Sequence, residues 1–437
     1  MQIDRLLFHR REIFLSVALT LTVPLLTPRA PSAEPKPTGT PNILVIVADD
    51  LGPGNVRCYD RQAKAPTPNI DRLATGGLRM TQGYSADPMC WPSRGAILTG
   101  RYPQRWGNSP LVSRTEKMMP QYVKAKDYYT MAVGKWHQGF GPENHPMTWS
   151  FDEFFGFQGG WHDYFRAGVG PDKSKGDKEE AVGANPILRN HEPVREIKYL
   201  TFELSDQAVA FLEGNRERPF LLYLAYNARH VPAQAPQDYI ARFQGERYAI
   251  VAALDDGIGQ VLDALDRLGL AQNTLVIFVG DNGGPEWGTG GLRGCKGQVY
   301  EGGIRIPFLA RWPARLPAGK TYDEPVMHID LTPTVLAAVG LEIPGHLDGV
   351  NLLPYWLDEK QEAPHENLFW GLPPKKYAAR AGDRKLVVNE GVPELYDLSS
   401  DPHEETNLAA QQPEVLQEML EQARAWQQRT GKPRDDR

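Results

Sequence analysis

Asn42-Ile43-Leu44-Val45-Ile46-Val47-Ala48 is an unbroken apolar run, and Asp49-Asp50-Leu51-Gly52 follows it directly. Such a run is typical of a strand that is buried on both faces of a parallel sheet. Similar runs predict three further strands, at Tyr128–Val133, Pro219–Tyr226 and Thr274–Val279. The pattern therefore indicates an α/β fold built on a parallel sheet.

Helical spacing marks the segments between these strands. Pro66–Ala74 predicts an N-capped helix, and Tyr199–Glu213 a second one. Pro236–Leu268 has apolar residues on one face and predicts a single long amphipathic helix. The central sheet is therefore expected to be flanked by helices.

The pattern changes near Glu366, where short apolar pieces alternate with turns. These pieces, which predict a small antiparallel sheet, are Leu368–Trp370, Tyr377–Arg380 and Lys385–Val388. A closing helix is expected over Pro413–Arg429. We therefore expect a larger N-terminal domain at residues 34–364 and a small C-terminal domain at residues 365–437.

Composition narrows the class of protein. The 437 residues carry a formal net charge of −6 without a basic block, which argues against a nucleic-acid partner. Cys58, Cys90 and Cys295 are too few for a disulfide framework, although a Cys58–Cys295 bridge would leave Cys90 free. The 42 glycines and 37 prolines indicate many turns and long loops.

Residues 1–33 have the features of a secretory signal peptide. Basic residues, Arg5, Arg10 and Arg11, precede an apolar run at Ile13–Leu26, and small residues follow it. The run is short for a transmembrane span, so an uncleaved anchor is the alternative. We expect an exported protein, periplasmic or secreted, without a stable membrane anchor.

Polar residues follow two of the predicted strands at their carboxyl ends, where ligands gather in open α/β sheets. Asp49 and Asp50 follow the first strand, and Asp281 and Asn282 follow Thr274–Val279. Adjacent acids repel each other without a cation, and a hard divalent metal prefers oxygen ligands of this kind. A solvated turn with one acid capping a helix is the alternative interpretation of the Asp pair.

Cys90-Trp91-Pro92-Ser93-Arg94 places a lone cysteine on a tight turn before a small-residue run that predicts a helix. The start of a helix favours negative charge, so this position could lower the pKa of a thiol or hold an oxyanion near a nucleophile. A buried structural cysteine is the alternative.

Two further strand ends carry basic and imidazole groups. Lys135 and His137 lie two residues apart, and therefore on one side of the chain, just after Tyr128–Val133. His230 follows the strand at Pro219–Tyr226. A cation beside an imidazole suits the binding of a tetrahedral anion, whereas each residue alone would more often be solvated or structural.

Together these segments resemble the signatures of the type I, formylglycine-dependent sulfatases, which are arylsulfatase-like members of the alkaline phosphatase superfamily. The matching motifs, in the family's order, are T-P-N-I-D-x-L-A at Thr67–Ala74, C-x-P-S-R…T-G-R at Cys90–Arg101, G-K-W-H at Gly134–His137, H-x-P at His230–Pro232, D-N-G at Asp281–Gly283, L-R-G-x-K-G at Leu292–Gly297, Y-E-G-G-x-R-x-P at Tyr300–Pro307 and L-Y-D-L…N-L at Leu395–Leu408. Trp91 stands where the family most often has a small residue. The resemblance covers residues 41–410. It implies a catalytic domain at residues 34–364 with a large, mixed, mostly parallel central sheet flanked by helices, and a smaller C-terminal domain of antiparallel sheet plus helix.

The resemblance also implies a mechanism of sulfate ester hydrolysis. A formylglycine-generating enzyme would oxidise Cys90 to formylglycine, whose hydrate is the nucleophile and passes through a covalent sulfo-enzyme intermediate. The implied ligands of one Ca²⁺ are Asp49, Asp50, Asp281, Asn282 and the group made from Cys90. Arg94 would orient the nucleophile, and His137 would act as the base that restores the aldehyde. The implied sulfate-binding residues are Lys135, His230 and Lys296, the last two of which could assist departure of the alcohol.

Export and candidate rim aromatics favour a sulfated carbohydrate as the substrate. The candidate rim aromatics are Trp91, Trp106, Trp161, Tyr164 and Trp287. Trp161 and His162 are the further candidate substrate-binding residues, although their segment could equally be a packed loop. We expect a deep, narrow pocket suited to a terminal sugar.

The sequence leaves two alternative functions open. A phosphodiester or phosphonate monoester hydrolase of the same fold would use similar metal-binding acids. A non-catalytic protein that binds sulfated glycans would keep the site without turnover.

Overall fold

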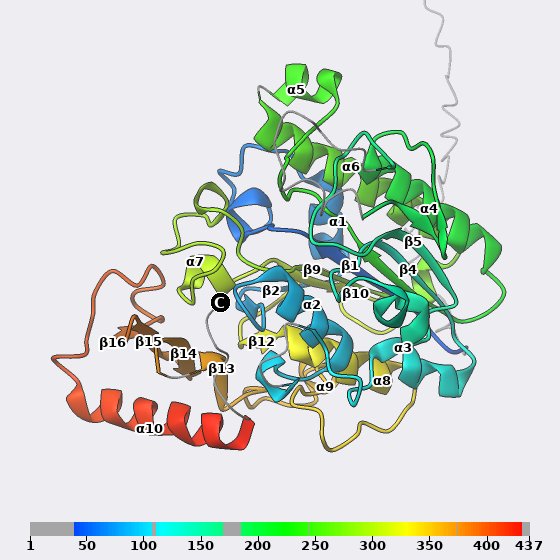
Figure 1. Cartoon of the computed structure of the whole chain (residues 1–437). Coiled ribbons are helices and arrows are strands. Elements are labelled where there is room, and N and C mark those ends of the chain that lie inside the picture. Colours follow the sequence, from blue (N-terminus) through cyan, green and yellow to red (C-terminus); the bar gives the residue numbers. More distant parts are fainter. Residues whose placement is uncertain (1–38, 107–110, 169–184, 244, 373, 431–437) are drawn as a thin grey trace, which may run out of the picture. The chain divides into compact units, whose positions relative to one another are not determined.

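A mixed sheet of ten strands forms the centre of the described protein (Figure 1). The structure is a computed structural model and describes residues 39–106, 111–168, 185–243, 245–372 and 374–430. The predicted signal peptide at residues 1–33 lies outside these ranges. Within them, no helix combines the length and the apolar character that crossing a bilayer requires.

Five neighbouring strands at the middle of the sheet are parallel. The sheet order is β11 (Lys320–Tyr322), β2 (Leu78–Met80), β10 (Phe308–Arg311), β9 (Thr274–Gly280), β1 (Asn42–Ala48), β8 (Phe220–Ala225), β4 (Tyr129–Lys135), β5 (Glu153–Phe157), β6 (Leu188–Arg189) and β7 (Glu192–Pro193). Strand β10 runs antiparallel to both of its neighbours, and β6 is antiparallel to both β5 and β7. The predicted mixed, mostly parallel sheet is confirmed.

Strand β1 lies between β8 and β9 and is buried along its whole length. Successive side chains of a strand point to opposite faces. Leu44 and Ile46 accordingly belong to one core cluster, whereas Val45 and Val47 belong to the other. The first cluster includes side chains from α1 (Pro68–Thr75), α4 (Leu200–Gly214) and α6 (Glu246–Arg267), and the second from α2 (Cys90–Thr99), α3 (Met119–Val123), α8 (Leu331–Ala338) and α9 (Leu353–Trp356). In Figure 1, α4 and α6 lie on one side of the sheet, and α2 and α8 on the other. Helices on both faces explain why these strands are continuously apolar.

The prediction of one helix over Pro236–Leu268 is wrong. The segment forms two helices, α5 (Gln237–Phe243) and α6, with Gly245 between them. Gly245 has φ 138°, a backbone conformation that residues with a Cβ atom rarely adopt. The amphipathic pattern runs through the break because α5 also rests its apolar side chains on the core.

Helix α1 lies where Pro66–Ala74 predicts a helix, but it begins at Pro68 and its first turn is capped by a distant residue. Thr67 makes no capping hydrogen bond with its side chain. The carboxylate of Asp255, on α6, instead accepts hydrogen bonds from the N–H groups of Asn69 and Ile70 at 2.8–3.1 Å. Burial raises the pKa of Asp255 to about 6, although these hydrogen bonds favour its charged form.

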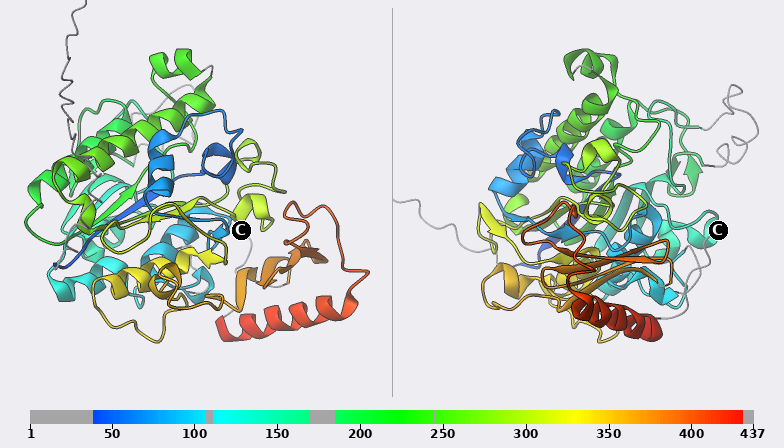
Figure 2. Two further views of the ribbon diagram at one scale, coloured as in Figure 1. Left: turned by 180° about the vertical axis from the view of Figure 1, so that it is seen from behind. Right: turned by 90° about the vertical axis from the view of Figure 1, so that its left-hand side faces the viewer.

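The C-terminal residues form the predicted small antiparallel sheet and closing helix. The elements are β13 (Asn367–Leu372), β14 (Lys376–Ala381), β15 (Arg384–Asn389), β16 (Val392–Asp397) and α10 (Pro413–Thr430). Helix α10 runs alongside this sheet (Figure 2), where Trp426 stacks on Phe369 with ring centroids 4.8 Å apart. The expected domain boundary, between residues 364 and 365, falls just before β13.

A buried ion cluster joins the small sheet to the segment that carries Lys296. Nζ of Lys385 lies 2.8 Å from the carboxylates of both Glu301 and Glu404, and all three side chains are fully buried. Glu301 begins the short helix α7 (Glu301–Ile304). Burial opposes the charge of Glu301, but Lys385 and Arg305 outweigh it and hold its pKa at about 2. Through Lys385, the C-terminal sheet therefore neutralises Glu301, which follows Lys296 in the chain.

Two short strands pair outside the two larger sheets, and the three cysteines form no disulfide. Strand β3 (Gly83–Tyr84) pairs in parallel with β12 (Val326–Met327). Cys58, Cys90 and Cys295 are all free, so the bridge considered between Cys58 and Cys295 does not form.

Candidate active site

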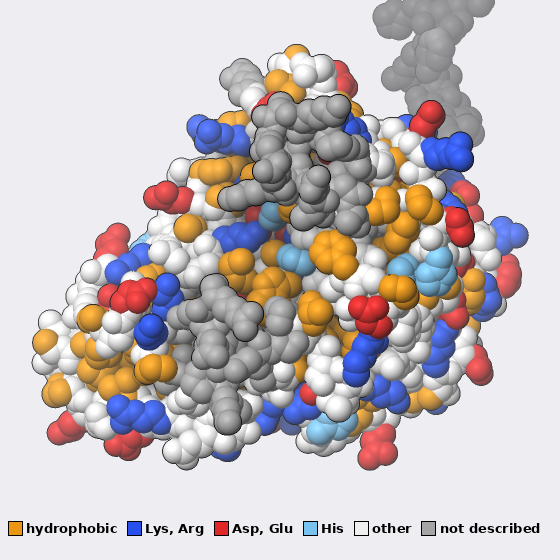
Figure 3. Space-filling view, viewed as in Figure 1, with side chains coloured by type: hydrophobic (Ala, Val, Ile, Leu, Met, Phe, Trp, Pro, Cys, Tyr) orange, Lys and Arg blue, Asp and Glu red, His pale blue; other side chains and the backbone are white. Residues whose placement is uncertain are grey.

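The candidate site forms where four adjacent parallel strands end. Asp49 follows β1, Asp281 follows β9, Lys135 ends β4, and the segment with His230 follows β8. These strands are neighbours in the order β9, β1, β8, β4, so their carboxyl ends meet at one edge. Near the centre of the face seen in Figure 3, histidine, basic and hydrophobic side chains lie beside one another.

Two buried acids and two buried cations form the floor of the site. Asp49, Arg94, Lys135 and Asp281 are all 0% exposed. Nζ of Lys135 lies 2.5 Å from Oδ2 of Asp49. Nη2 of Arg94 lies 2.9 Å from Oδ2 of Asp281 and 3.6 Å from Oδ1 of Asp49. Burial opposes the charge of Asp49, but Lys135, His230 and Arg94 outweigh it and lower its pKa.

Asp50 connects this floor to Lys296 and His230. Its backbone has φ 55°, and its N–H donates to Oδ1 of Asp281 at 2.9 Å. Oδ1 of Asp50 lies 2.7 Å from Nζ of Lys296 and accepts a 2.9 Å hydrogen bond from Asn282, while Oδ2 lies 3.9 Å from Nε2 of His230. Burial opposes this ion pair, but the attraction lowers the pKa of Asp50 and raises that of Lys296.

Cys90 is the first residue of α2 and is 3% exposed. The sequence correctly places it at a helix start. A lowered thiol pKa, however, does not result, because burial raises the pKa of Cys90 more than Lys135 lowers it. The thiol is therefore protonated near neutral pH and is a poor nucleophile as it stands.

The donor atoms around Cys90 fit a hard cation. Single ligand atoms of Asp49, Cys90 and Asp281 all lie within 4.8 Å of one another. Oδ1 of Asp49 is buried and accepts no hydrogen bond from the described residues. Burial and the charge of Asp49 also raise the pKa of Asp281, which a nearby positive ion would reverse. These three residues could therefore hold a metal ion.

His137 lies in the left-handed region of the backbone, with φ 56°. Its Nδ1 atom is buried and has no hydrogen-bond partner among the described residues. Burial lowers the pKa of His137 well below its usual value, and Lys135 and Arg94 lower it further. The imidazole is therefore neutral at pH 7 and able to accept a proton.

Models of known protein families match nearly the whole described chain. A family model described as "Sulfatase" matches residues 41–341, and one described as "N-sulphoglucosamine sulphohydrolase, C-terminal" matches residues 295–429. The chain belongs to the sulfatase family. Its relatives within the alkaline phosphatase superfamily are formylglycine-dependent sulfatases, and this sulfatase is accordingly a sulfuric ester hydrolase.

Curated relatives of this sulfatase act on different esters by name. Arylsulfatase A of Homo sapiens is 35% identical, with 86% of both chains covered. Steryl-sulfatase of Mus musculus is 34% identical over 77% of this chain and 69% of that one. N-acetylgalactosamine-6-sulfatase of Homo sapiens is 35% identical over 74% of this chain and 66% of that one.

Solved structures share the fold of this sulfatase. The crystal structure of Ps i-CgsB in complex with k-i-k-neocarrahexaose has a TM-score of 0.81 and 34% identity, covering 89% of this chain and 93% of that one. A phosphonate monoester hydrolase of Agrobacterium radiobacter has a TM-score of 0.68 at 20% identity over 90% of this chain and 96% of that one, which shows a shared fold only.

Not all expected rim residues of the sulfatase lie at a rim. Trp161 and Trp287 are 39% and 38% exposed, and Trp91 is half-buried. His162 is 1% exposed and packs beside Phe157, with ring centroids 5.1 Å apart. The candidate substrate-binding role of His162 therefore has no support in its position, since its ring lies inside the protein.

Trp106 and Tyr164 are also buried, and Tyr164 has a different role from the expected one. Its hydroxyl donates to the carbonyls of Asn227 and His230, at 2.7 and 2.9 Å. Tyr164 therefore holds the backbone of the loop that carries His230.

Two buried residues of this sulfatase site were not identified from the sequence. Arg229 donates to the carbonyl of Asp50 at 3.0 Å, and its guanidinium carbon lies 4.0 Å from the centre of the Trp287 ring. His328 is 0% exposed and hydrogen-bonds the carbonyl of Gly280 at 2.9 Å, just before Asp281. The only available signal for Arg229 was its position beside His230, and His328 lies in an ordinary helix-start pattern.

Proposed function

We propose that this sulfatase removes O-sulfate groups from a sulfated carbohydrate, using a nucleophile made from Cys90. The observation that carries the proposal is the buried group of Asp49, Cys90 and Asp281, whose ligand atoms lie within 4.8 Å of one another. Around it lie two lysines and two histidines that suit a tetrahedral anion. The carbohydrate class is supported by a relative named N-acetylgalactosamine-6-sulfatase, by the similar Ps i-CgsB, which was solved in complex with k-i-k-neocarrahexaose, and by the exposed Trp161 and Trp287.

A single Ca²⁺ would be held by Asp49, Asp50, Asp281 and Asn282. The donor set supports this assignment, because the ligand atoms of Asp49 and Asp281 lie within 4.8 Å of each other and Oδ1 of Asp49 has no hydrogen-bond partner among the described residues. A bound Ca²⁺ would supply positive charge and Lewis acidity toward an anionic ester.

The chain's own residues bind and orient the substrate. Lys135, Lys296 and His230 would neutralise the oxygens of the sulfate group, and preorganised charges of this kind are worth most in a site that excludes water. Arg94 holds the side chains of Asp49 and Asp281 and would orient the nucleophile at position 90. His230 or Lys296 would also donate a proton to the departing alcohol.

His137 would accept the proton that must leave the nucleophile when sulfate is released. Burial and the nearby cations keep the imidazole unprotonated, and the negative charge of a bound sulfate would raise its lowered pKa toward the working pH that suits a general base. Formylglycine, when formed at position 90, would supply a hydrated aldehyde as the nucleophile in place of the protonated thiol.

Conversion of Cys90 would have to precede folding. Its side chain is 3% exposed at the start of α2, so a formylglycine-generating enzyme has no access to it in the folded protein.

We further propose that residues 1–33 direct export to the periplasm or outside the cell, and that residues 365–437 form a separate small domain.

The test combines the mass of the peptide that contains Cys90 with sulfate release from an aryl sulfate and from sulfated oligosaccharides. We expect a peptide lighter than the thiol form by the difference between a thiol and an aldehyde, and no activity in Cys90→Ala. A fully converted enzyme that cleaves phosphonate monoesters but no sulfate ester would contradict the proposal.

A further inference from the structure

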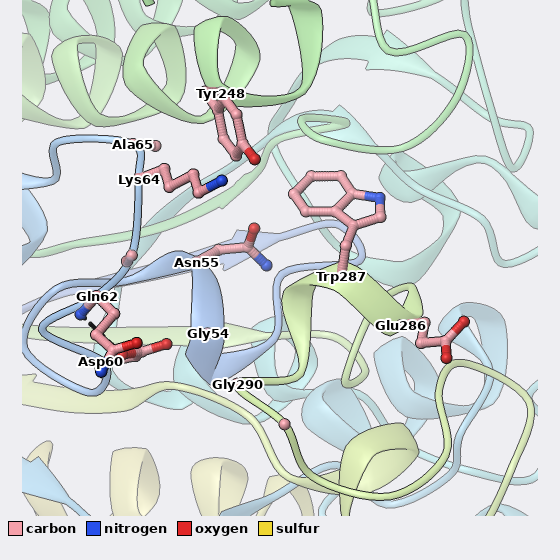
Figure 4. A pocket seen from close by; sticks show the side chains of 12 residues that line it. Gly54, Asn55, Asp60, Gln62, Lys64, Ala65, Tyr248, Glu286, Trp287 and Gly290 are labelled. Carbon is pink, nitrogen blue, oxygen red and sulfur yellow. Dashed lines mark hydrogen bonds between the residues drawn. The ribbon is translucent and has the colours of Figure 1, made fainter.

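A cavity with a volume of about 610 Å³ lies beside the candidate active site. It is lined by the loop after β1, at Gly54–Ala65, by the loop after β9, at Glu286–Gly291, and by Tyr248 of α6 (Figure 4). None of the residues assigned above to the nucleophile, the cation or the sulfate lines it. The cavity is therefore additional to the sulfate-binding site.

Two aromatic rings form one wall of this cavity. Tyr248 and Trp287 meet edge to face, with centroids 6.4 Å apart at 82°. In Figure 4 the side chain of Lys64 points into the space between these rings, beside Asn55. Partly exposed aromatic rings with polar groups beside them suit a sugar ring, which has apolar C–H faces and hydroxyls at its edge.

Two cations at these rings have no acidic partner. Nζ of Lys64 lies 5.6 Å from the Tyr248 centroid, and the guanidinium of Arg247 lies 5.4 Å from that of Trp287. Neither side chain forms an ion pair with any residue that the structure describes. The two acids of the cavity are placed elsewhere: Glu286 points away from Trp287, and Asp60 lies at the far end beside Gln62 (Figure 4). The aromatic end of the cavity therefore favours an anionic group.

Arg229 connects this cavity to the sulfate-binding site. Its guanidinium lies against the face of Trp287 while it donates to the backbone carbonyl of Asp50. Arg229 is 5% exposed, and its Nε atom has no hydrogen-bond partner among the described residues. The loops also touch directly, since a Cβ atom on Gly52 would lie 2.1 Å from the carbonyl oxygen of Gly283. The two sites therefore share the same two loops.

We propose that this cavity binds a neighbouring sugar of the saccharide whose sulfate is removed, through an anionic substituent on that sugar. The inference rests on the proposed function, and it adds that the substrate is an oligosaccharide with at least two charged residues. The anionic substituent is a sulfate or a carboxylate. Trp287 and Tyr248 would contact the sugar ring, and Lys64 and Arg247 its charge.

The experiment compares a small substrate with two longer ones. The small substrate is an aryl sulfate, which fills only the sulfate-binding site. The longer ones are sulfated tetrasaccharides, one with sulfate as its only anion and one that also carries uronic carboxylates. The variants are Lys64→Ala and Trp287→Ala, with Trp287→Phe as the conservative change. Lys117→Ala is the matched control, because Lys117 is also exposed and lies 4.5 Å from a tyrosine ring, that of Tyr122.

We expect Lys64→Ala and Trp287→Ala to raise the KM for a tetrasaccharide about tenfold. The kcat/KM of Lys64→Ala for the aryl sulfate should stay within about twofold of the parent value, and Trp287→Phe should restore most of the tetrasaccharide loss that Trp287→Ala causes. If Lys64→Ala raises the KM more for one tetrasaccharide than for the other, the anionic group of that tetrasaccharide is the substituent that the cavity binds. Lys117→Ala should leave the KM and kcat/KM unchanged for the aryl sulfate and for both tetrasaccharides.

Equal losses on the aryl sulfate and the tetrasaccharides, or no loss on either, would overturn the inference while leaving the proposed function intact. The carbohydrate assignment, and the inference with it, would instead be overturned by an enzyme that cleaves aryl sulfates but neither tetrasaccharide, and whose Cys90→Ala variant binds neither tetrasaccharide.

Discussion

Gly160 lies against the imidazole of His137, the residue proposed as the general base. A Cβ atom on Gly160 would lie 2.6 Å from Nε2 and 2.8 Å from Cε1 of that ring. Real Cβ atoms do not approach other atoms so closely, and so the contact requires glycine. The loop that follows β5 thus sets the position of a group in a different part of the chain.

Gly160→Ala should therefore displace the His137 ring and lower kcat. We expect a loss of about 10- to 100-fold, since small misplacements of catalytic groups have effects of this size. The measurement is steady-state kinetics with an aryl sulfate. Gly345→Ala is the control, because no atom lies within 4 Å of its added methyl group. An unchanged kcat in Gly160→Ala would show that the loop accommodates the methyl group without displacing the His137 ring.

Lys385→Met should destabilise the protein strongly. The substitution leaves Glu301 and Glu404 buried beside each other without their shared cation. Removing one partner of a buried ion pair typically costs about 3–5 kcal/mol in the free energy of unfolding. Lys198→Met removes an exposed pair with Asp206, 3.7 Å long, and should cost no more than about 1 kcal/mol. Urea denaturation of both variants measures the two losses in the free energy of unfolding. Equal losses would show that burial does not make the Lys385 cluster more important than an exposed ion pair.

The stability of the protein should depend on the protonation of Asp255. Its pKa is about 6 in the folded state, above the ordinary 3.8. The folded protein therefore binds this proton more tightly than the unfolded chain does, and stability falls as pH rises from about 4 to about 6. Relative to Asp255→Asn, the wild type should lose at most about 1.4 kcal/mol per pH unit in that window. Parallel unfolding curves for the two proteins between pH 4 and 6 would contradict this assignment.

Calcium should stabilise the protein independently of activity. A ligand at one hundred times its Kd, bound only by the folded state, raises the free energy of unfolding by about 2.7 kcal/mol. We expect a shift of this size on replacing a chelator with Ca²⁺, and little shift in Asp281→Asn, which lacks one proposed ligand charge. Asp263→Asn, a change at a mostly exposed acid, should respond like the wild type. If Ca²⁺ does not change the free energy of unfolding of the wild type, the proposed calcium site is wrong.

The sequence predicts the central strands and the residues at their ends well, for a physical reason. Strand β1 is buried on both faces, so its composition alone identifies it, and Asp49 must then lie at the functional edge of the sheet. The four-strand sheet and α10 are similarly local patterns. Such features depend on neighbours in the chain and not on distant contacts.

Other features depend on contacts that composition does not encode. Asp255 caps α1 from 185 residues away along the chain, as measured to Ile70. His162 and Tyr164 stand in a segment with the polar and aromatic character of a rim, yet both are buried. Arg229 is invisible as a functional residue until Trp287 and Asp50 are seen on either side of its guanidinium.

The strand order of the central sheet has a consequence for folding kinetics. Strand β2, at residues 78–80, lies between β10 and β11, which are made more than 220 residues later. Strand β1 likewise pairs only with β8 and β9. The sheet therefore cannot close until most of the chain has been synthesised, and such non-local pairing is intrinsically slow. An incomplete chain would expose apolar strand edges, and its yield should depend on chaperones and on dilution more than on the stability of the finished protein.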